Sequence, residues 1–442
     1  MVHYQPPQDW QQWVEWLAAG LHGRSRWRLS LILLGMVFAR GRRTVTTWLR
    51  AVGIRADFAD YYYFLQPLGR KSQALAERLF VLLLARLPTG PRLLLAVDDT
   101  PTKRYGPCVQ GAGIHHNPTP GPADQKFLYG HIWVTISLVL RHALWDTIGL
   151  PVLGLLSVRL TDIAKIPKQH GWEFRTKLQL ALQALRPLVQ LAIAAGKAVW
   201  IVADGAYAKR PFLRPLRSMG VTVVSRLRKD AALYTVPVPS KTRQRGRPRI
   251  YGAKRMHLKR RAAQPMGWVQ VPCFVYGQLC IKTVKTFLAT YRPAGGLIRV
   301  VIVQEEKGCE FFFCTDPDAT PREIIEAFGD RAAIEQDFHD VKEVWGTGQQ
   351  QVRNIWTNVA VFNLNLWVHT LVECWAWHKP AEELCDRRDS PWDDPERRPS
   401  HADRRKALRR QTLQNEYLSL STTHRLSSKI RALYERLLKL AA

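Results

Sequence analysis

The sequence predicts an α/β fold. Two continuous apolar segments, 93–97 and 198–203, are each followed directly by acidic residues, as expected for buried strands that deliver carboxylates to one edge of a sheet. After the second segment come a short helical stretch, with Pro211 near its start, and another apolar strand at 221–226. A strand, a helix and a strand in this order form a parallel crossover unit.

Residues 1–90 are predicted to form a helical N-terminal region. Apolar residues recur at helical intervals within 10–17, and segments 31–38 and 79–87 are apolar enough for buried helices. Arginines and threonines gather within 40–50. This cluster is compatible with phosphate contacts from a small DNA-binding unit, and equally with an ordinary basic helix surface.

The first part of the α/β core is assigned to residues 91–234. Its first strand is predicted to end at Asp98 and Asp99, and its second at Asp204. Because successive side chains of a strand point to opposite faces, only one of Asp98 and Asp99 can face the site served by a given neighbour.

Between these strands the pattern predicts a hairpin and a helix. Apolar residues alternate from 132 to 140, and a second strand-like segment covers 144–156. The two can pair across the short break between them. A long amphipathic helix is then predicted over 173–195.

Residues 235–316 are predicted to form a basic, β-rich insertion. Residues 241–261 contain ten Lys or Arg and no acid. This contiguous basic segment favours binding to DNA phosphates or a minor groove over a merely solvated loop. Strand-like segments follow from Trp268 to Thr315. The arginines of the Arg-Gly-Arg-Pro-Arg motif are Arg245, Arg247 and Arg249.

The second part of the core is assigned to residues 317–380 and contains a helix that begins at Pro321, with Thr320 as its cap. At about 100° per residue, four of its side chains fall within roughly 60° of one another. They are Phe328, Arg331, Glu335 and Lys342. A carboxylate between cations suits a metal site beside phosphates, although a solvated ion-paired face has the same pattern.

Residues 354–377 continue as an apolar helix, and residues 381–442 are assigned to a charged linker followed by a C-terminal helix. The linker, 381–411, mixes acids, bases and prolines, which is typical of a solvated segment.

The composition points to a polyanionic partner. The chain has 442 residues with 65 Lys and Arg against 36 Asp and Glu, a formal net charge of +29. Nucleic acid is the first candidate for such an excess. The seven cysteines include no C-x-x-C pair, which disfavours a zinc site. No apolar stretch is long enough for a membrane span and no secretory signal is present, so we expect a soluble intracellular protein.

Three carboxylate positions therefore stand out: Asp98 or Asp99, Asp204, and Glu335. Each alone has an ordinary explanation as a turn, a cap or an ion pair. Together, in a strongly basic chain, they are suitable ligands for Mg²⁺ or Mn²⁺. Two such ions roughly 3.5–4 Å apart can activate a nucleophile and stabilise the leaving oxygen of an in-line displacement.

These residues resemble a known family. The spacing Phe328-x2-Arg331-x3-Glu335-x6-Lys342 resembles the Tyr-Arg-Glu-Lys signature of bacterial transposases of the insertion-sequence-4 type. The motifs around Asp99 and Asp204 are similar to the first two aspartate motifs of the same DDE superfamily. The loop Asp-Asp-Thr-Pro-Thr-Lys is also similar to the insertion-sequence-701 group. The resemblance covers about residues 93–350.

The resemblance implies an RNase H-like mixed sheet flanked by helices. It implies that Asp99, Asp204 and Glu335 are catalytic and bind two Mg²⁺ ions, with Mn²⁺ as a substitute. Asp99 is preferred because Asp-Thr matches the family motif, which leaves Asp98 as a supporting residue.

The same resemblance implies that Arg331 and Lys342 hold DNA phosphates. Phe328 departs from the family tyrosine and lacks its hydroxyl. Some relatives stack a flipped base on a tryptophan of the insertion, for which Trp268 is the candidate.

The predicted function is a DNA transposase that cuts insertion-sequence ends and joins the 3′-hydroxyl ends to target DNA. Its partners would be double-stranded DNA, namely terminal inverted repeats and target DNA, and a second copy of the chain in a homodimer. It would be cytoplasmic and nucleoid-associated, without membrane contact. The alternatives are an RNase H-like structure-selective nuclease and a non-catalytic DNA-binding protein derived from a transposase.

Overall fold

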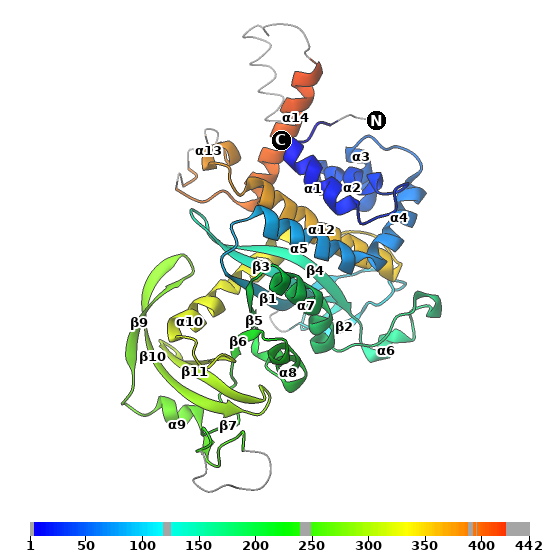
Figure 1. Cartoon of the computed structure of the whole chain (residues 1–442). Coiled ribbons are helices and arrows are strands. Elements are labelled where there is room, and N and C mark those ends of the chain that lie inside the picture. The colour runs from blue at the N-terminus through cyan, green and yellow to red at the C-terminus, as the bar shows by residue number, and fades with distance from the viewer. Residues whose placement is uncertain (1–3, 118–124, 239–248, 388–391, 395, 421–442) are drawn as a thin grey trace.

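The computed structural model describes residues 4–117, 125–238, 249–387, 392–394 and 396–420. It is a mixed α/β structure in which one large sheet is flanked by helices (Figure 1). Within the described residues, no helix has both the length and the apolar character needed to cross a bilayer. The seven cysteines are free thiols.

The N-terminal region is helical, as predicted, and it packs on the core. Gly69 lies so close to the backbone of Trp356 that a side chain at this position would collide with it. This glycine therefore allows two helices from distant parts of the chain to pack closely. The helices of the region are α1 (Gln8–Ala18), α2 (Trp27–Phe38), α3 (Val45–Ala51), α4 (Phe58–Arg70) and α5 (Ser72–Arg86).

The core sheet begins with β1 (Arg92–Lys103), which pairs with the antiparallel strand β3 (Phe127–His142) and the parallel strand β5 (Ala198–Ala203). The strand β4 (Asp146–Ser157) forms the predicted hairpin with β3, and β2 (Gly113–His116) pairs with the other end of β3. Next to β5, the parallel strand β6 (Thr222–Arg226) completes the crossover unit through α8 (Arg210–Ser218). The order β4-β3-β1-β5-β6 is the RNase H-like mixed sheet that the family resemblance implied.

β1 is longer than predicted. The sequence suggested that it ends at the two acids, but pairing with β3 continues past them to Lys103 opposite Gly130. The reason is the length of β3, whose backbone groups bond β1 along almost its entire course. Asp98 and Asp99 therefore lie inside β1, at the level where its shorter neighbour β5 ends.

Helices cover both faces of this sheet. On one face, α7 (Lys177–Ala194) and the buried helix α12 (Ile355–Ala376) contribute to the main apolar core. Asn363, Trp367 and Thr370 of α12 bond the backbone of β4. On the other face, apolar residues of α10 (Pro321–Asp330) and α11 (Ala332–Glu343) pack on β1, β5 and β6 in a second core. Short helical turns at α6 (Leu160–Ile163) and η1 (Lys168–His170) precede α7.

The strands of the insertion extend the core sheet. β12 (Gly308–Cys314) pairs with β6, and the sheet continues through β11 (Gly296–Glu305) and β10 (Gln278–Tyr291). The remaining elements are β7 (Leu233–Tyr234), β8 (Arg255–Met256), α9 (Leu258–Ala262) and β9 (Val269–Val275). The segment is β-rich as predicted, but its backbone pairing with β6 makes one continuous sheet (Figure 1).

The predicted helix over 321–342 is two helices. α10 ends at Asp330, α11 begins at Ala332, and Arg331 lies between them with Ile334 N–H bonding its carbonyl at 3.0 Å. The predicted cap is present, since Thr320 and Glu323 form a capping box with Pro321 in the first turn.

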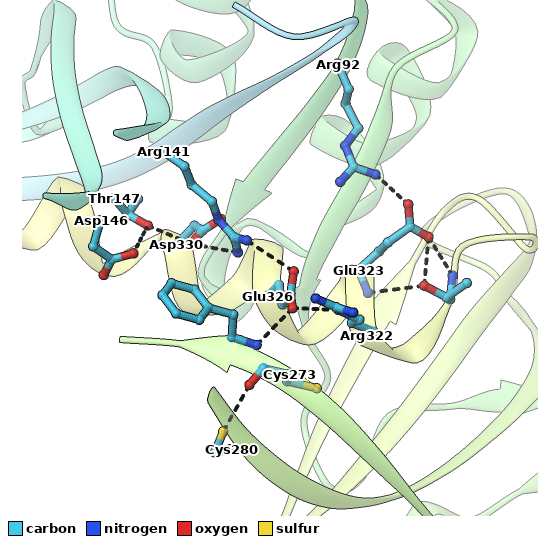
Figure 2. A network of polar contacts seen from close by, with 12 residues as sticks. Arg92, Arg141, Asp146, Thr147, Cys273, Cys280, Arg322, Glu323, Glu326 and Asp330 are labelled. Carbon is cyan, nitrogen blue, oxygen red and sulfur yellow. Dashed lines mark hydrogen bonds and ion pairs between the residues drawn. The ribbon is translucent and has the colours of Figure 1, made fainter. Parts of the chain in front are cut away.

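Ion pairs fix the outer face of α10 (Figure 2). Arg141 of β3 bonds Asp330 and Glu326, and Arg92 of β1 bonds Glu323 at 2.7 Å. The β9 amide of Phe274 also donates to Glu326 at 2.9 Å. These contacts hold the start of the helix pair, and with it Glu335, against the sheet.

The segment predicted to be a solvated linker differs from that expectation. It includes α13 (Ala381–Leu384) and most of α14 (His401–Leu420). Arg404, Arg405 and Arg409 of α14 are buried. Arg405 donates to four backbone carbonyls, those of Met36, Val37, Ala39 and Val344. Mixed charge indicated solvation, but backbone carbonyls of other elements accept from Arg405, and the buried carboxylate of Glu373 pairs with Arg404. The part of the predicted C-terminal helix beyond Leu420 lies outside the described residues.

Candidate active site

Asp98 and Asp204 lie side by side at the centre of the sheet. β1 and β5 are parallel and in register up to Val97 opposite Ala203. Asp98 and Asp204 are the next residues on the two strands. Parallel strands bring their carboxyl ends to the same edge, which is where open α/β sheets bind ligands.

Asp98 and Asp99 point to opposite sides of β1. Ala96, on the Asp98 side, packs in the apolar cluster that contains Ile334 and Phe338 of α11. Val97, on the Asp99 side, belongs to the main core beneath α7 and α12. The face covered by the Glu335 helix is therefore the Asp98 face.

Arg331 joins Asp98 to Glu335. Its two terminal nitrogens donate to Asp98 Oδ2 at 2.6 Å and to Glu335 Oε1 at 2.7 Å. Its guanidinium also lies 5.3 Å from the centre of the Phe328 ring, within cation–π range. The side chain of Glu335 is 57% exposed, so it stands at the open rim of the site.

The carboxyl of Asp98 is short of compensating positive charge. Burial raises the pKa of Asp98 to about 6, Arg331 and the Asp99 amide oppose this rise, and the nearby carboxylates of Asp99 and Asp204 add to it. A carboxyl group whose pKa is raised and that lies beside other carboxylates is characteristic of sites that bind cations or transfer protons.

Asp99 has a different set of partners. Lys177 Nζ, at the first position of α7, donates to Asp99 Oδ2 at 2.6 Å. The hydroxyl of Tyr207 donates to Asp99 Oδ1 at 3.3 Å. Burial and the charges of Asp99 and Asp98 hold the pKa of Tyr207 well above its usual value, so it remains a donor.

Asp204 starts a 3-10 turn, η2 (Gly205–Tyr207), by accepting from the Ala206 amide at 3.5 Å. This turn is what brings Tyr207 back to the two acids of β1. The sequence pattern did not identify Lys177 or Tyr207. A usable signal existed for Lys177, because the capping pair Thr176 and Gln179 defines where α7 begins.

Comparison with known families identifies the family of the chain. Residues 17–273 match the family model for DDE superfamily endonucleases, which is more than half of the chain. The chain belongs to the DDE superfamily endonucleases. A search of curated proteins finds no match. A DDE superfamily endonuclease is a nuclease-type enzyme that acts on DNA with divalent metal ions, which agrees with the predicted class of function.

The carboxylates of this DDE endonuclease fit a divalent cation by chemistry. Asp98, Asp204 and Glu335 could supply the hard oxygen ligands that such a cation prefers. The pKa of Asp98 is raised by burial, and a bound divalent cation would stabilise its ionised form. Arg331 now supplies positive charge between two of them.

A compact His-Glu-His group lies elsewhere in the DDE endonuclease. Its members are His369, Glu373 and His401. Among the described residues, this is the one group of at least three His, Cys, Asp or Glu side chains whose potential metal-binding atoms all lie within 4.8 Å of one another. Glu373 is paired with Arg404 and accepts from His401 Nδ1 at 2.5 Å. Trp345 donates to His401 Nε2 at 2.8 Å. Glu373 therefore already carries a cation and both His401 nitrogens are in use, whereas His369 Nδ1 is buried without a hydrogen-bond partner among the described residues.

Lys342 and Phe328 have different environments. Lys342 lines an open groove of about 980 Å³ together with Asp99, Lys103 and Arg42. Burial lowers the pKa of Lys342. The centre of the Phe328 ring lies 4.7 Å from that of Phe312, and the guanidinium of Arg331 lies over the same ring. Phe328 therefore supports Arg331 through packing.

The insertion residues are only partly described. Arg245 and Arg247 lie outside the described residues, and Arg249 is exposed. Trp268 donates to the carbonyl of Gln264 at 3.1 Å, and Lys285 Nζ lies 4.7 Å from its ring. Trp268 is therefore packed within the insertion in this structure.

Proposed function

We propose that this DDE endonuclease is a transposase that cuts at the ends of its element and joins the freed 3′-hydroxyls to target DNA. The observation that carries the proposal is the Arg331 bridge from Asp98 of β1 to Glu335 of α11, beside Asp204, which directly follows the parallel strand β5. The order of these acids and the spacing around Glu335 resemble transposases of the insertion-sequence-4 type.

We assign the first ligand position to Asp98 in place of Asp99. Asp98 is on the face of β1 that Glu335 shares, and one guanidinium spans the two carboxylates. Asp99 then acts as a positioning residue that Lys177 and Tyr207 hold. The sequence motif favoured Asp99, and the contacts of the folded chain favour Asp98.

The chemistry follows from these residues. Mg²⁺ or Mn²⁺, bound as a pair by the three carboxylates, would activate water or a 3′-hydroxyl and stabilise the leaving oxygen. Arg331 and Lys342 would neutralise phosphate oxygens beside the scissile bond, as their charge and location permit. Glu335 is at the exposed rim, where a duplex can reach it.

A groove next to the acids offers a path for a DNA strand. It is open, has a volume of about 980 Å³ and is lined by Arg42, Lys103 and Lys342 as well as Asp99. Tyr105, 82% exposed, stands on its wall and also lines two adjoining hollows. Cations with an exposed aromatic ring suit a nucleic-acid strand.

The insertion adds a basic surface for the duplex. The exposed Lys and Arg side chains of this part include Lys254, Arg255, Lys259, Arg260 and Arg261. We propose that this surface, the Arg245–Arg249 segment and the N-terminal region bind the terminal inverted repeats. Two copies of the chain, each holding one end, would act as a homodimer.

The test is cleavage in vitro of DNA that carries the element's own ends, with Mg²⁺ or Mn²⁺. Wild-type protein should release the ends and form strand-transfer joints, whereas Asp204→Asn and Glu335→Gln should lose both. Glu306→Gln, an exposed acid in the turn between β11 and β12, serves as the control. Cut ends without joints indicate a structure-selective nuclease, and metal-independent binding without cutting indicates a non-catalytic DNA-binding protein.

A further inference from the structure

Arg331 occupies the position from which it can control access to two of the three carboxylates. One nitrogen bonds Asp98 at 2.6 Å and the other bonds Glu335 at 2.7 Å. A single planar group therefore spans the first acid on the sheet and the acid on the helix. While this bridge persists, the bridged oxygens of both carboxylates face a fixed positive charge.

The surroundings of Arg331 hold it in place without satisfying it fully. The Phe328 ring lies 5.3 Å from its guanidinium and packs on Phe312. Its third nitrogen, Nε, is buried and has no hydrogen-bond partner among the described residues. A donor without an acceptor costs free energy, so a conformation that gave Nε an acceptor would compete with the bridge.

A DNA phosphate is such an acceptor. Guanidinium groups bind phosphate through two parallel hydrogen bonds, and the whole chain attracts DNA through its net charge of +29. A phosphate at the rim, next to the exposed Glu335, can draw Arg331 outward. Departure of the arginine leaves Asp98 and Glu335 with uncompensated negative charge, which favours a divalent cation.

We propose that Arg331 is a gate that blocks divalent-metal binding at Asp98 and Glu335 until DNA draws it away. This inference rests on the proposed function of the site. It makes metal binding and DNA binding mutually favourable, and such a coupling must act equally in both directions.

The experiment measures Mn²⁺ binding to the full-length protein by the electron paramagnetic resonance signal of free Mn²⁺, without DNA. Arg331→Gln should bind Mn²⁺ more tightly than wild type by on the order of tenfold or more, because the substitution removes hydrogen bonds between charged groups. Arg331→Lys should show a smaller gain, because an ammonium keeps the charge but lacks the planar fork.

Arg322→Gln is the matched control. Arg322 also pairs with an acid four residues later, Glu326, at 2.8 Å on the neighbouring helix α10. The Arg322→Gln substitution should leave the affinity of the protein for Mn²⁺ unchanged. Thermal unfolding of each variant establishes that the comparison is between folded proteins, and Arg331→Lys supplies the comparison if Arg331→Gln does not fold.

The location of the gained site is tested by adding Asp98→Asn to Arg331→Gln, which should remove the gain. A short duplex should raise the Mn²⁺ affinity of wild type toward that of Arg331→Gln and change the variant much less. Equal Mn²⁺ affinity in wild type and the two Arg331 variants, with and without duplex, overturns the gate.

Failure of the gate differs from failure of the function. If Mn²⁺ binds wild type with DNA and Glu335→Gln abolishes that binding, while Arg331 variants gain nothing without DNA, the gate alone is wrong. If neither Asp204→Asn nor Glu335→Gln alters Mn²⁺ binding under any condition, the proposed metal-dependent function fails with it.

Discussion

At the scale of single residues, Asp98 and Asp99 are neighbours in the sequence that have different partners in the fold. Asp98 is bridged to Glu335 by Arg331, whereas Asp99 is held by Lys177 and Tyr207. Their side chains are similarly shielded, 19% and 26% exposed, so burial does not separate them. Their partners do, because the pleat of β1 sends them to opposite helices.

The two acids should respond differently to substitution. Asp98→Asn should lower the rate of DNA end cleavage by more than about 100-fold, since even groups that only support a metal ligand usually change activity by about 10–100-fold. Asp99→Asn should stay within that smaller range. The measurement is single-turnover cleavage at saturating Mg²⁺.

A double variant tests the positioning role of Asp99. Lys177→Met should resemble Asp99→Asn, and combining them should cost little more than either alone, because both remove the same 2.6 Å ion pair. A larger loss for Asp99→Asn than for Asp98→Asn would reverse our assignment.

His131 predicts a pH dependence of stability. This buried histidine of β3 accepts from Arg104 Nε at 3.2 Å, and its Nε2 lies 3.0 Å from the carbonyl of Gln110. Burial first, and then the charge of Arg104, lowers the pKa of His131 to about 3 from 6.5. Between these values the unfolded chain binds a proton that the folded chain excludes, so stability rises with pH across this window and is lost as pH falls.

When the pH falls from 7 to 5, protonation of His131 in the unfolded chain should by itself decrease the free energy of unfolding by about 2 kcal/mol. Denaturant unfolding at the two pH values measures it. His131→Gln should reduce the difference, whereas the exposed His116→Gln should keep it. An unchanged difference in His131→Gln would show that other groups produce the pH effect.

At the scale of elements, α11 connects the site to the interior. Glu335 faces the rim, while Asp337, two residues later, is buried and accepts from Ser137 of β3 at 2.7 Å. Asp337 also lies 3.6 Å from His369 Nε2 of α12, and the His369 ring stacks on His401 of α14 at 3.9 Å. The orientation of the Glu335 helix is therefore coupled to two helices far from it in sequence.

Glu373 is the carboxylate on which that network depends. The Arg404 and His401 partners hold the pKa of Glu373 well below its usual range despite burial. Glu373→Gln leaves the buried Arg404 without its counter-charge. Breaking a buried pair from one side typically costs about 3–5 kcal/mol, and we expect a loss of that order in denaturant unfolding.

The exposed pair Lys379–Glu383, 3.5 Å apart, is the matched control. Glu383→Gln should change stability by less than about 1 kcal/mol. A chelator should leave the melting temperature of wild type unchanged, since Arg404 already neutralises Glu373 and both ring nitrogens of His401 are hydrogen-bonded. A clear drop with chelator would instead identify it as a structural metal site.

At the scale of the whole molecule, charge controls association with DNA. A net charge of +29 on a mixed α/β chain implies many phosphate contacts and release of counterions on binding. The helix α9 lies between β8 and β9, two strands of the sheet that continues from the core, so its basic residues and the acids are joined through one sheet.

Binding should weaken steeply and linearly on a logarithmic plot against salt concentration. Replacing Lys259, Arg260 and Arg261 together with Gln should reduce the magnitude of this slope by about one for each phosphate that these side chains neutralise. Fluorescence anisotropy with duplex DNA at several salt concentrations measures it. A slope identical to wild type would place the duplex elsewhere on the surface.

Local pattern was sufficient for several elements. The apolar strands before Asp98 and Asp204, the β3–β4 hairpin, the Thr320–Pro321 helix start and the buried helix α12 follow from periodicity and capping rules. The three acidic positions and the Arg331–Glu335 pair were also visible, because spacing along one helix is a local property.

Local pattern was insufficient where distant partners decide. The length of β1 depends on β3, the joining of the insertion to the core depends on the β6–β12 pairing, and the burial of Arg404 and Arg405 depends on other helices. The capping pair Thr176 and Gln179 places Lys177 at the start of α7, but it does not indicate that Lys177 meets Asp99, 78 residues away.

The sequence by itself determined the class of the protein: a basic α/β chain with two strand-borne aspartates and a helix-borne glutamate in a fixed order. Only the tertiary structure decided which aspartate of the adjacent pair faces that glutamate and which cation lies between them. The reason is that a strand's pleat alternates its side chains strictly, and the face that is functional is set by whichever helix packs there.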